Sequence, residues 1–186
     1  MEEIELIFET TKESMDSSIE HLRKELKKIS TGKANPAMLD GLLVDYYGSP
    51  TPLNRVANVG VSDSKTLTIQ PWEKSMLAPI EQAIFKANMG VTPQNDGEIV
   101  RIIIPPLTQD RRKQLVKNAK SLVEDTKVSL RNARRDAISE IKQAVKDGLS
   151  EDIGKDKEKE IDEMTKNYGN KSEELFKVKE KDILTI

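Results

Sequence analysis

The feature that most constrains this fold is a stretch of about 40 residues, from Thr108 to Asp147, that contains neither glycine nor proline. Because those two residues interrupt helices most strongly, the stretch predicts a single helix about 60 Å long. Thr108 is a suitable N-cap, Asp110 suits the first turn, and Gly148 can end the helix. A helix this long needs other long helices to cover its apolar side.

Two further segments show the heptad spacing of packed helices. Near the N-terminus, apolar residues recur every seven positions and a second series fills the other seam: Phe8, Met15, Leu22 and Ile29, with Ile19 and Leu26. After Gly148, Ser150 can start another helix, whose sparser seam is Ile161, Met164, Tyr168, Leu175 and Val178. Gly154 and Gly169 weaken this last prediction. We therefore expect three helices that bury one another's seams.

The segment 31–104 has a different character, because it holds six of the eight prolines and six of the nine glycines. Three runs with strand character lie in it, at residues 42–47, 65–70 and 99–104. We expect a turn at 48–52 and a short helix over 75–89, capped by Ser75 and ended by Gly90. The predicted class is α+β: a three-helix bundle (1–30 and 105–186) with an inserted β/α/β domain (31–104).

The chain must leave the bundle and return to it at one end of these helices. The outgoing connection is Ser30, Thr31 and Gly32, and the returning one contains Pro105 and Pro106. Two connections side by side predict a two-stranded hinge, in which the prolines stiffen the return strand.

The charge is unevenly distributed, although the net charge is only −2. Residues 105–148 carry eleven Lys and Arg side chains against six Asp and Glu, whereas both flanking helical segments are net acidic. On a helical wheel nine of these eleven cations fall within an arc of about 120°, and Arg112 lies just outside it. This stripe comprises Lys113, Lys117, Lys120, Lys127, Arg131, Arg134, Arg135, Lys142 and Lys146.

Two interpretations of the stripe are open. It could bind a phosphate backbone, or its cations could pair with the acidic helices beside it. Arg131, Arg134 and Arg135 favour RNA, because guanidinium forks suit phosphate oxygens and base edges better than ammonium groups do.

Several kinds of chemistry have no residues to support them. There is no cysteine, His21 is the single histidine, and no glycine-rich phosphate loop is present. The N-terminus is acidic and no apolar run approaches the about 20 residues that span a bilayer. We expect a cytoplasmic, monomeric protein that is not an enzyme and has no cofactor. We also expect Tyr46 and Tyr47 to point to opposite faces of a strand, and Trp72 to be a packing anchor.

Four motifs along the chain resemble the ribosome recycling factor family. They are Thr31-Gly-Lys-Ala-Asn-Pro with Leu39-Asp-Gly, Tyr46-Tyr-Gly-Ser-Pro-Thr-Pro-Leu, Pro105-Pro-Leu-Thr with Arg111-Arg-Lys, and Arg131-Asn-Ala-Arg-Arg-Asp-Ala. The chain departs from the family pattern at Lys33, where arginine is more usual. Lysine keeps the charge there but lacks the fork.

The resemblance implies an L-shaped factor that binds the post-termination ribosome and, with elongation factor G and GTP, separates its subunits and releases mRNA and tRNA. It implies that Arg112, Arg131 and Arg134 contact RNA of the large subunit, while Lys127 and Arg135 follow from the helical wheel. Two other classes stay open: a helical adaptor, which would not bind RNA in a salt-dependent manner, and an enzyme.

Overall fold

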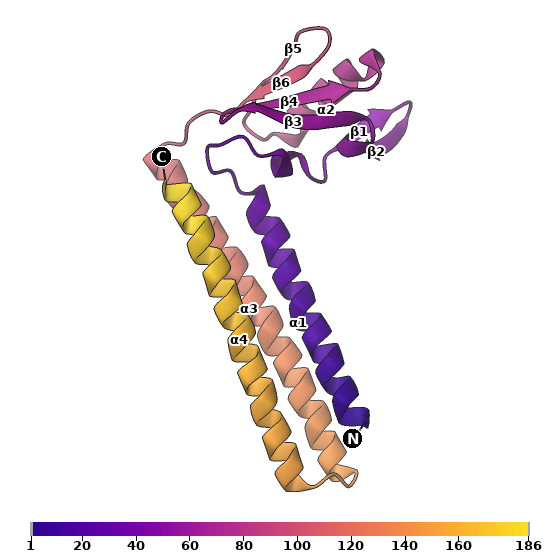
Figure 1. Cartoon of the computed structure of the whole chain (residues 1–186), viewed down its shortest axis with the longest axis vertical. Helices are drawn as coiled ribbons and strands as arrows, with labels where there is room; N and C mark the ends of the chain where they lie inside the picture. The colour runs from indigo at the N-terminus through magenta and orange to yellow at the C-terminus, as the bar shows by residue number, and fades with distance from the viewer. Residues whose placement is uncertain (1, 186) are drawn as a thin grey trace. The chain divides into compact units, whose positions relative to one another are not determined.

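The computed structural model describes residues 2–185 and contains three long helices and a smaller β-rich part (Figure 1). The helices are α1 (Glu2–Lys28), α3 (Gln109–Lys146) and α4 (Glu151–Leu184). By their internal contacts the residues divide into two compact units, one up to Leu26 and from Gln114 on, the other Lys27–Lys113. The α+β class with a long helical part is thus confirmed.

Helix α3 begins and ends with the signals that its sequence predicts. The Thr108 hydroxyl accepts a hydrogen bond from the Arg111 N–H at 3.1 Å, which satisfies one free donor of the first turn. At the other end Gly148 has φ 117°, and the N–H groups of Gly148 and Leu149 reach back to the carbonyls of Val145 and Ala144. These two hydrogen bonds form a Schellman motif, and a glycine adopts the positive φ that the motif requires without strain.

The helices of the bundle pack through two apolar clusters. One contains Ile4 and Ile7 of α1, Ala137, Ile141 and Ala144 of α3, and Ile161 of α4. The other contains Met15, Ile19, Leu130 and Tyr168. The buried series of α1 is Ile4, Ile7, Thr11, Met15, Ile19, Leu22 and Leu26, so the predicted seam is correct except at Phe8, which is half-buried, and Ile29, which lies beyond the helix. Each cluster draws on all three helices, so none of them has its apolar side covered without the other two.

The second unit is built on an antiparallel sheet in the order β3-β4-β6-β5 and a hairpin, β1-β2. The hairpin is β1 (Leu43–Tyr46) and β2 (Ser49–Pro52). The sheet is β3 (Ala57–Asp63), β4 (Thr66–Pro71), β5 (Pro93–Asn95) and β6 (Val100–Ile103). Helix α2 (Leu77–Ala87) contacts β1, β5 and β6 and covers the core of this unit.

Three local predictions in this unit were wrong. Residues 49–52 form strand β2, because the turn takes only Tyr47 and Gly48, at φ 49° and 87°. Both values are positive, as a two-residue type I′ hairpin turn requires. Ser75 does not cap α2, which follows a short 3-10 turn, and Asn88 at φ 49° ends the helix before Gly90. Strands β3 and β5 were not predicted.

Strand β3, which was not predicted, contains a glycine, Gly60, in its interior. Gly60 lies opposite Thr68 in the sheet, and a Cβ on Gly60 would come 3.3 Å from the Thr68 hydroxyl. The glycine therefore accommodates a close neighbour inside a strand.

The two glycines of α4 allow a matched test of packing in the bundle. A Cβ on Gly154 would lie 2.5 Å from Cγ2 of Val145, whereas a Cβ on Gly169 would meet nothing within 4 Å. Gly169→Ala should stabilise the protein by up to about 1 kcal/mol through helix propensity. Gly154→Ala should destabilise it by about 1–2 kcal/mol, because overpacking exceeds that gain. Thermal unfolding measures both, and a higher midpoint for both variants would contradict the close contact.

A second prediction concerns Tyr168, whose hydroxyl donates a 2.5 Å hydrogen bond from α4 to Asp16 of α1. Burial, together with this bond, raises the pKa of Tyr168 to about 12. Because the folded pKa lies above the unfolded value of about 10, this stabilisation is present below about pH 10 and is lost as the pH rises towards 12. Tyr168→Phe should remove that part of the alkaline loss, as measured by chemical denaturation between neutral pH and pH 12. An identical pH dependence in the variant would contradict it.

Candidate nucleic-acid interface on helix α3

Helix α3 has a buried apolar face and an exposed basic face, and the second is the candidate interface. The buried positions are Leu115, Ala119, Val123, Thr126, Leu130, Ala137, Ile141 and Ala144. Most of the predicted stripe is exposed: Lys113, Lys117, Lys120, Arg131, Arg135, Lys142 and Lys146. Lys127 and Arg134 are half-buried, as is Arg112. The helical wheel thus separated the two faces correctly, and the stripe is accessible to a macromolecule over much of the helix.

Two cations of the stripe are paired with helix α4. The Nε of Arg134 donates to Oδ1 of Asp162 at 2.5 Å, and the Nζ of Lys127 bonds to Oε1 of Glu173. Lys127 also lies 3.8 Å from Glu124 on its own helix. The hydrogen bond to Glu173 raises the pKa of Lys127. The pairing interpretation therefore holds for these two cations, and binding of a phosphate backbone by the rest of the stripe stays a prediction.

The clustered arginines line a shallow groove at α3 and α4. Its walls are Arg131, Arg134, Arg135, Ile138, Lys142, Glu158 and Asp162, around a volume of about 340 Å³. The Nε of Arg131 bonds at 3.4 Å to the carbonyl of Lys127 on its own helix. Within residues 2–185, no carboxylate lies within ion-pair distance of Arg131, Arg135 or Lys142. The groove thus presents three unpaired cations and one that is held by a carboxylate.

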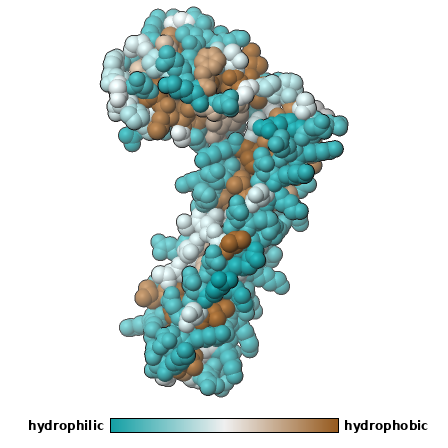
Figure 2. Space-filling view, turned by 180° about the vertical axis from the view of Figure 1, so that it is seen from behind, coloured by the Kyte–Doolittle hydropathy of each residue, from teal (hydrophilic) through white to brown (hydrophobic). Residues whose placement is uncertain are grey.

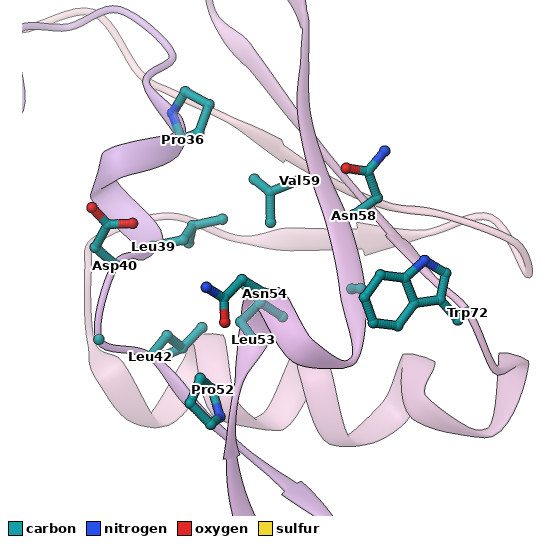
Figure 3. Close-up of a pocket in the computed structure, with 12 residues that line it drawn as sticks. Pro36, Leu39, Asp40, Leu42, Pro52, Leu53, Asn54, Asn58, Val59 and Trp72 are labelled. Carbon is teal, nitrogen blue, oxygen red and sulfur yellow. The ribbon is translucent and has the colours of Figure 1, made fainter.

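The second unit has an apolar pocket that sequence reasoning missed. It encloses about 360 Å³ and is lined mostly by Pro36, Leu39, Leu42, Pro52, Leu53, Val59 and Trp72. Figure 3 shows the apolar side chains around this space, with Trp72 at one side. Trp72 is 66% exposed, so its prediction as a packing anchor was wrong. The sequence feature that could have indicated this pocket is the group of prolines and leucines between Pro36 and Leu53. These residues are not consecutive and belong to several turns and strands, so they form no recognisable motif.

Tyr46 and Tyr47 also lie differently from the prediction. Their rings meet edge to face, with centroids 4.7 Å apart, and both hydroxyls donate to the Glu73 carboxylate at 3.1 and 2.8 Å. The bond to Glu73 raises the pKa of Tyr46. They lie together because the positive φ of Tyr47 takes it out of the strand's alternation.

Hydropathy differs between the surfaces of the two units. Figure 2 shows a bundle that is largely hydrophilic with separate apolar spots, and a larger apolar cluster on the visible face of the β-rich unit. Within residues 2–185 no helix is both long enough and apolar enough to cross a membrane. In the same part of the chain, no three or more His, Asp or Glu side chains gather where they could hold a metal ion.

Comparison with known proteins identifies the family. The family model described as "Ribosome recycling factor" matches residues 22–184. The chain belongs to the ribosome recycling factor family. The ribosome-recycling factor of Flavobacterium johnsoniae is 50% identical, over 100% of this chain and 99% of that protein. That of Porphyromonas gingivalis is 48% identical, over 100% of both.

Solved structures of the ribosome recycling factor family are similar along the whole chain. A solution structure of the ribosome recycling factor matches with a TM-score of 0.81 and 30% identity, over 100% of both chains. A second match is the T. thermophilus ribosome recycling factor in a set of models with E. coli elongation factor G bound to the E. coli post-termination complex. Its TM-score is 0.67 at 39% identity, over 98% of this chain and 99% of that one. The family resemblance inferred from the four motifs is thereby confirmed.

The pair between Lys127 and Glu173 can be tested directly. Glu173→Gln should lower the pKa of Lys127, because the charged hydrogen-bond acceptor is lost. The free energy of unfolding should fall by less than about 1 kcal/mol, since the pair is partly exposed. Glu174→Gln is the control, because the exposed Glu174 is the next residue and makes no such pair. NMR titration of the lysine Nζ groups measures the pKa, and equal shifts in both variants would contradict the assignment.

Proposed function

We propose that this chain binds the post-termination ribosome and, with elongation factor G and GTP, separates its subunits and releases mRNA and tRNA. The observation that carries the proposal is the membership of the whole chain in the ribosome recycling factor family. The T. thermophilus factor that resembles it belongs to a set of models, with E. coli elongation factor G, bound to the E. coli post-termination complex. The chain would act in the cytoplasm as a monomer, without catalysing a reaction and without a cofactor of its own.

Helix α3 would bind RNA of the large subunit through Lys127, Arg131, Arg134 and Arg135 of the stripe, and through Arg112 beside it. Support comes from the exposure of Arg131 and Arg135 and from the groove that these two line with Arg134. Unpaired cations on one helical face attract a phosphate backbone and release its counterions, so binding should weaken steeply with salt. A helical adaptor would show no such dependence.

The two connections between the long helices and the β-rich part of the chain would act as the hinge. Ser30, Thr31, Gly32, Pro105 and Pro106 lie outside helices and strands. Gly32 has φ 77°, and a Cβ there would come 3.3 Å from Leu107 of the return strand. Such a close approach favours two connecting segments that bend together. The prolines limit the bending to few backbone bonds, because their rings fix φ.

The test is light scattering of purified post-termination ribosomes with elongation factor G and GTP. The intact protein should lower the scattering as the subunits separate. Arg134→Ala should weaken binding to the large subunit by about 1–3 kcal/mol and slow the change in scattering. Arg23→Ala is the matched control, because the Arg23 side chain is 47% exposed, against 43% for Arg134, and is likewise paired with a carboxylate, Glu20, but belongs to α1 and not to α3.

Two results would contradict the proposal. If the intact protein neither binds ribosomes nor changes the scattering, the function is wrong and the helical adaptor becomes the better hypothesis. If Arg134→Ala and Arg23→Ala behave alike, the stripe is not the RNA-binding surface.

A further inference from the structure

Among the three clustered arginines, Arg134 differs from its neighbours in how its guanidinium is held. Its Nε donates to Asp162 of α4, and the two side chains keep 43% and 50% of their exposure. Arg131 bonds only to its own helix, and Arg135 has no ion pair within the described chain. A carboxylate from a second helix therefore fixes the direction of one arginine at the groove.

The engaged atom determines what Arg134 can still bind. A guanidinium carries five N–H donors in a plane, and the bond through Nε leaves its terminal Nη groups for another acceptor. Two parallel N–H groups match a phosphate or the O6 and N7 edge of guanine. The ion pair also offsets the charge of Arg134, so this side chain adds direction to the groove more than net charge.

The other cations of the groove have the complementary property. Arg131, Arg135 and Lys142 are exposed, and within residues 2–185 none of them is paired with a carboxylate. Long unpaired cations attract any phosphate backbone and carry little preference for a particular one. The groove thus combines general attraction from three cations with one oriented fork.

We propose that Asp162 is a positioning residue: it orients Arg134 so that the groove distinguishes its RNA site on the large subunit from other RNA. This inference rests on the proposed function. Asp162 does not touch the RNA in this scheme, and it lowers general affinity because it adds negative charge to the groove. Its benefit is the reduced freedom of a side chain that would otherwise be ordered only upon binding.

Glu158 provides a matched control for the charge. It lines the same groove on the same helix, is half-buried, and forms no ion pair with Arg134. Asp162→Asn and Glu158→Gln each remove one negative charge from the groove, and only the first weakens the acceptor of Arg134, because it replaces a carboxylate oxygen with a neutral amide oxygen. Asp162→Glu is a third variant, which keeps the charge but moves the carboxylate by one methylene.

The experiment measures the affinity of each variant for isolated large subunits and for poly(U), at two salt concentrations. Glu158→Gln should tighten binding to both by a similar factor, because it only reduces repulsion. Asp162→Asn should also tighten binding to poly(U), but its preference for large subunits should fall at least about fivefold, the scale of one directed contact. Asp162→Glu should lose preference without a change on poly(U), and thermal unfolding verifies that each variant is folded.

A double variant shows whether Asp162 acts through Arg134. In an Arg134→Ala background, Asp162→Asn should behave like Glu158→Gln on both RNAs, since there is no guanidinium left to orient. The inference is overturned if Asp162→Asn and Glu158→Gln alter the preference equally in the otherwise unchanged protein. If that protein itself does not prefer large subunits to poly(U), the proposed RNA site fails, and the positioning role fails with it.

Discussion

The rest of the bundle depends on the burial of the apolar face of α3 by two other helices. Leu130, Ala137 and Ile141 lie in clusters to which α1 and α4 both contribute, so none of the three helices is covered without the others. This constraint fixes the rotation of α3 about its axis. The cations of the stripe, Arg131 and Arg135 among them, are exposed as a consequence of what the opposite face must bury.

Helix α4 affects both the stability of the bundle and the electrostatics of its surface. Gly154 permits a close approach to Val145 of α3, and Tyr168 bonds to Asp16 of α1. The same helix brings Asp162 and Glu173 to two cations of the stripe. Ile161 of α4 is buried in an apolar cluster with α1 and α3, and the next residue, Asp162, pairs with Arg134. The packing of α4 therefore also determines where its carboxylates meet the stripe. An acidic helix beside a basic one thus both packs against the proposed RNA-binding surface and reduces its positive charge.

The sequence by itself determined the features that depend on local rules. The absence of Gly and Pro from Thr108 to Asp147 gave the extent of α3, and Thr108 and Gly148 gave its ends, since caps act within one turn. Heptad spacing identified four buried residues of α1, Met15, Ile19, Leu22 and Leu26, but not Ile4, Ile7 and Thr11. Hairpin details failed in the second unit, where Tyr47 adopts a positive φ that its residue type does not suggest.

Only the tertiary structure decided which charges face one another. The counts of acids and bases left open whether the stripe was paired, because Lys127 and Glu173, or Arg134 and Asp162, are far apart in the chain. The register of α4 against α3 brings these side chains together, and many residues contribute to it, Gly154 among them. The same holds for the apolar pocket, whose walls come from several turns and strands. Local sequence rules set which side of a helix is charged, whereas long-range packing sets how much of that charge is left for a partner.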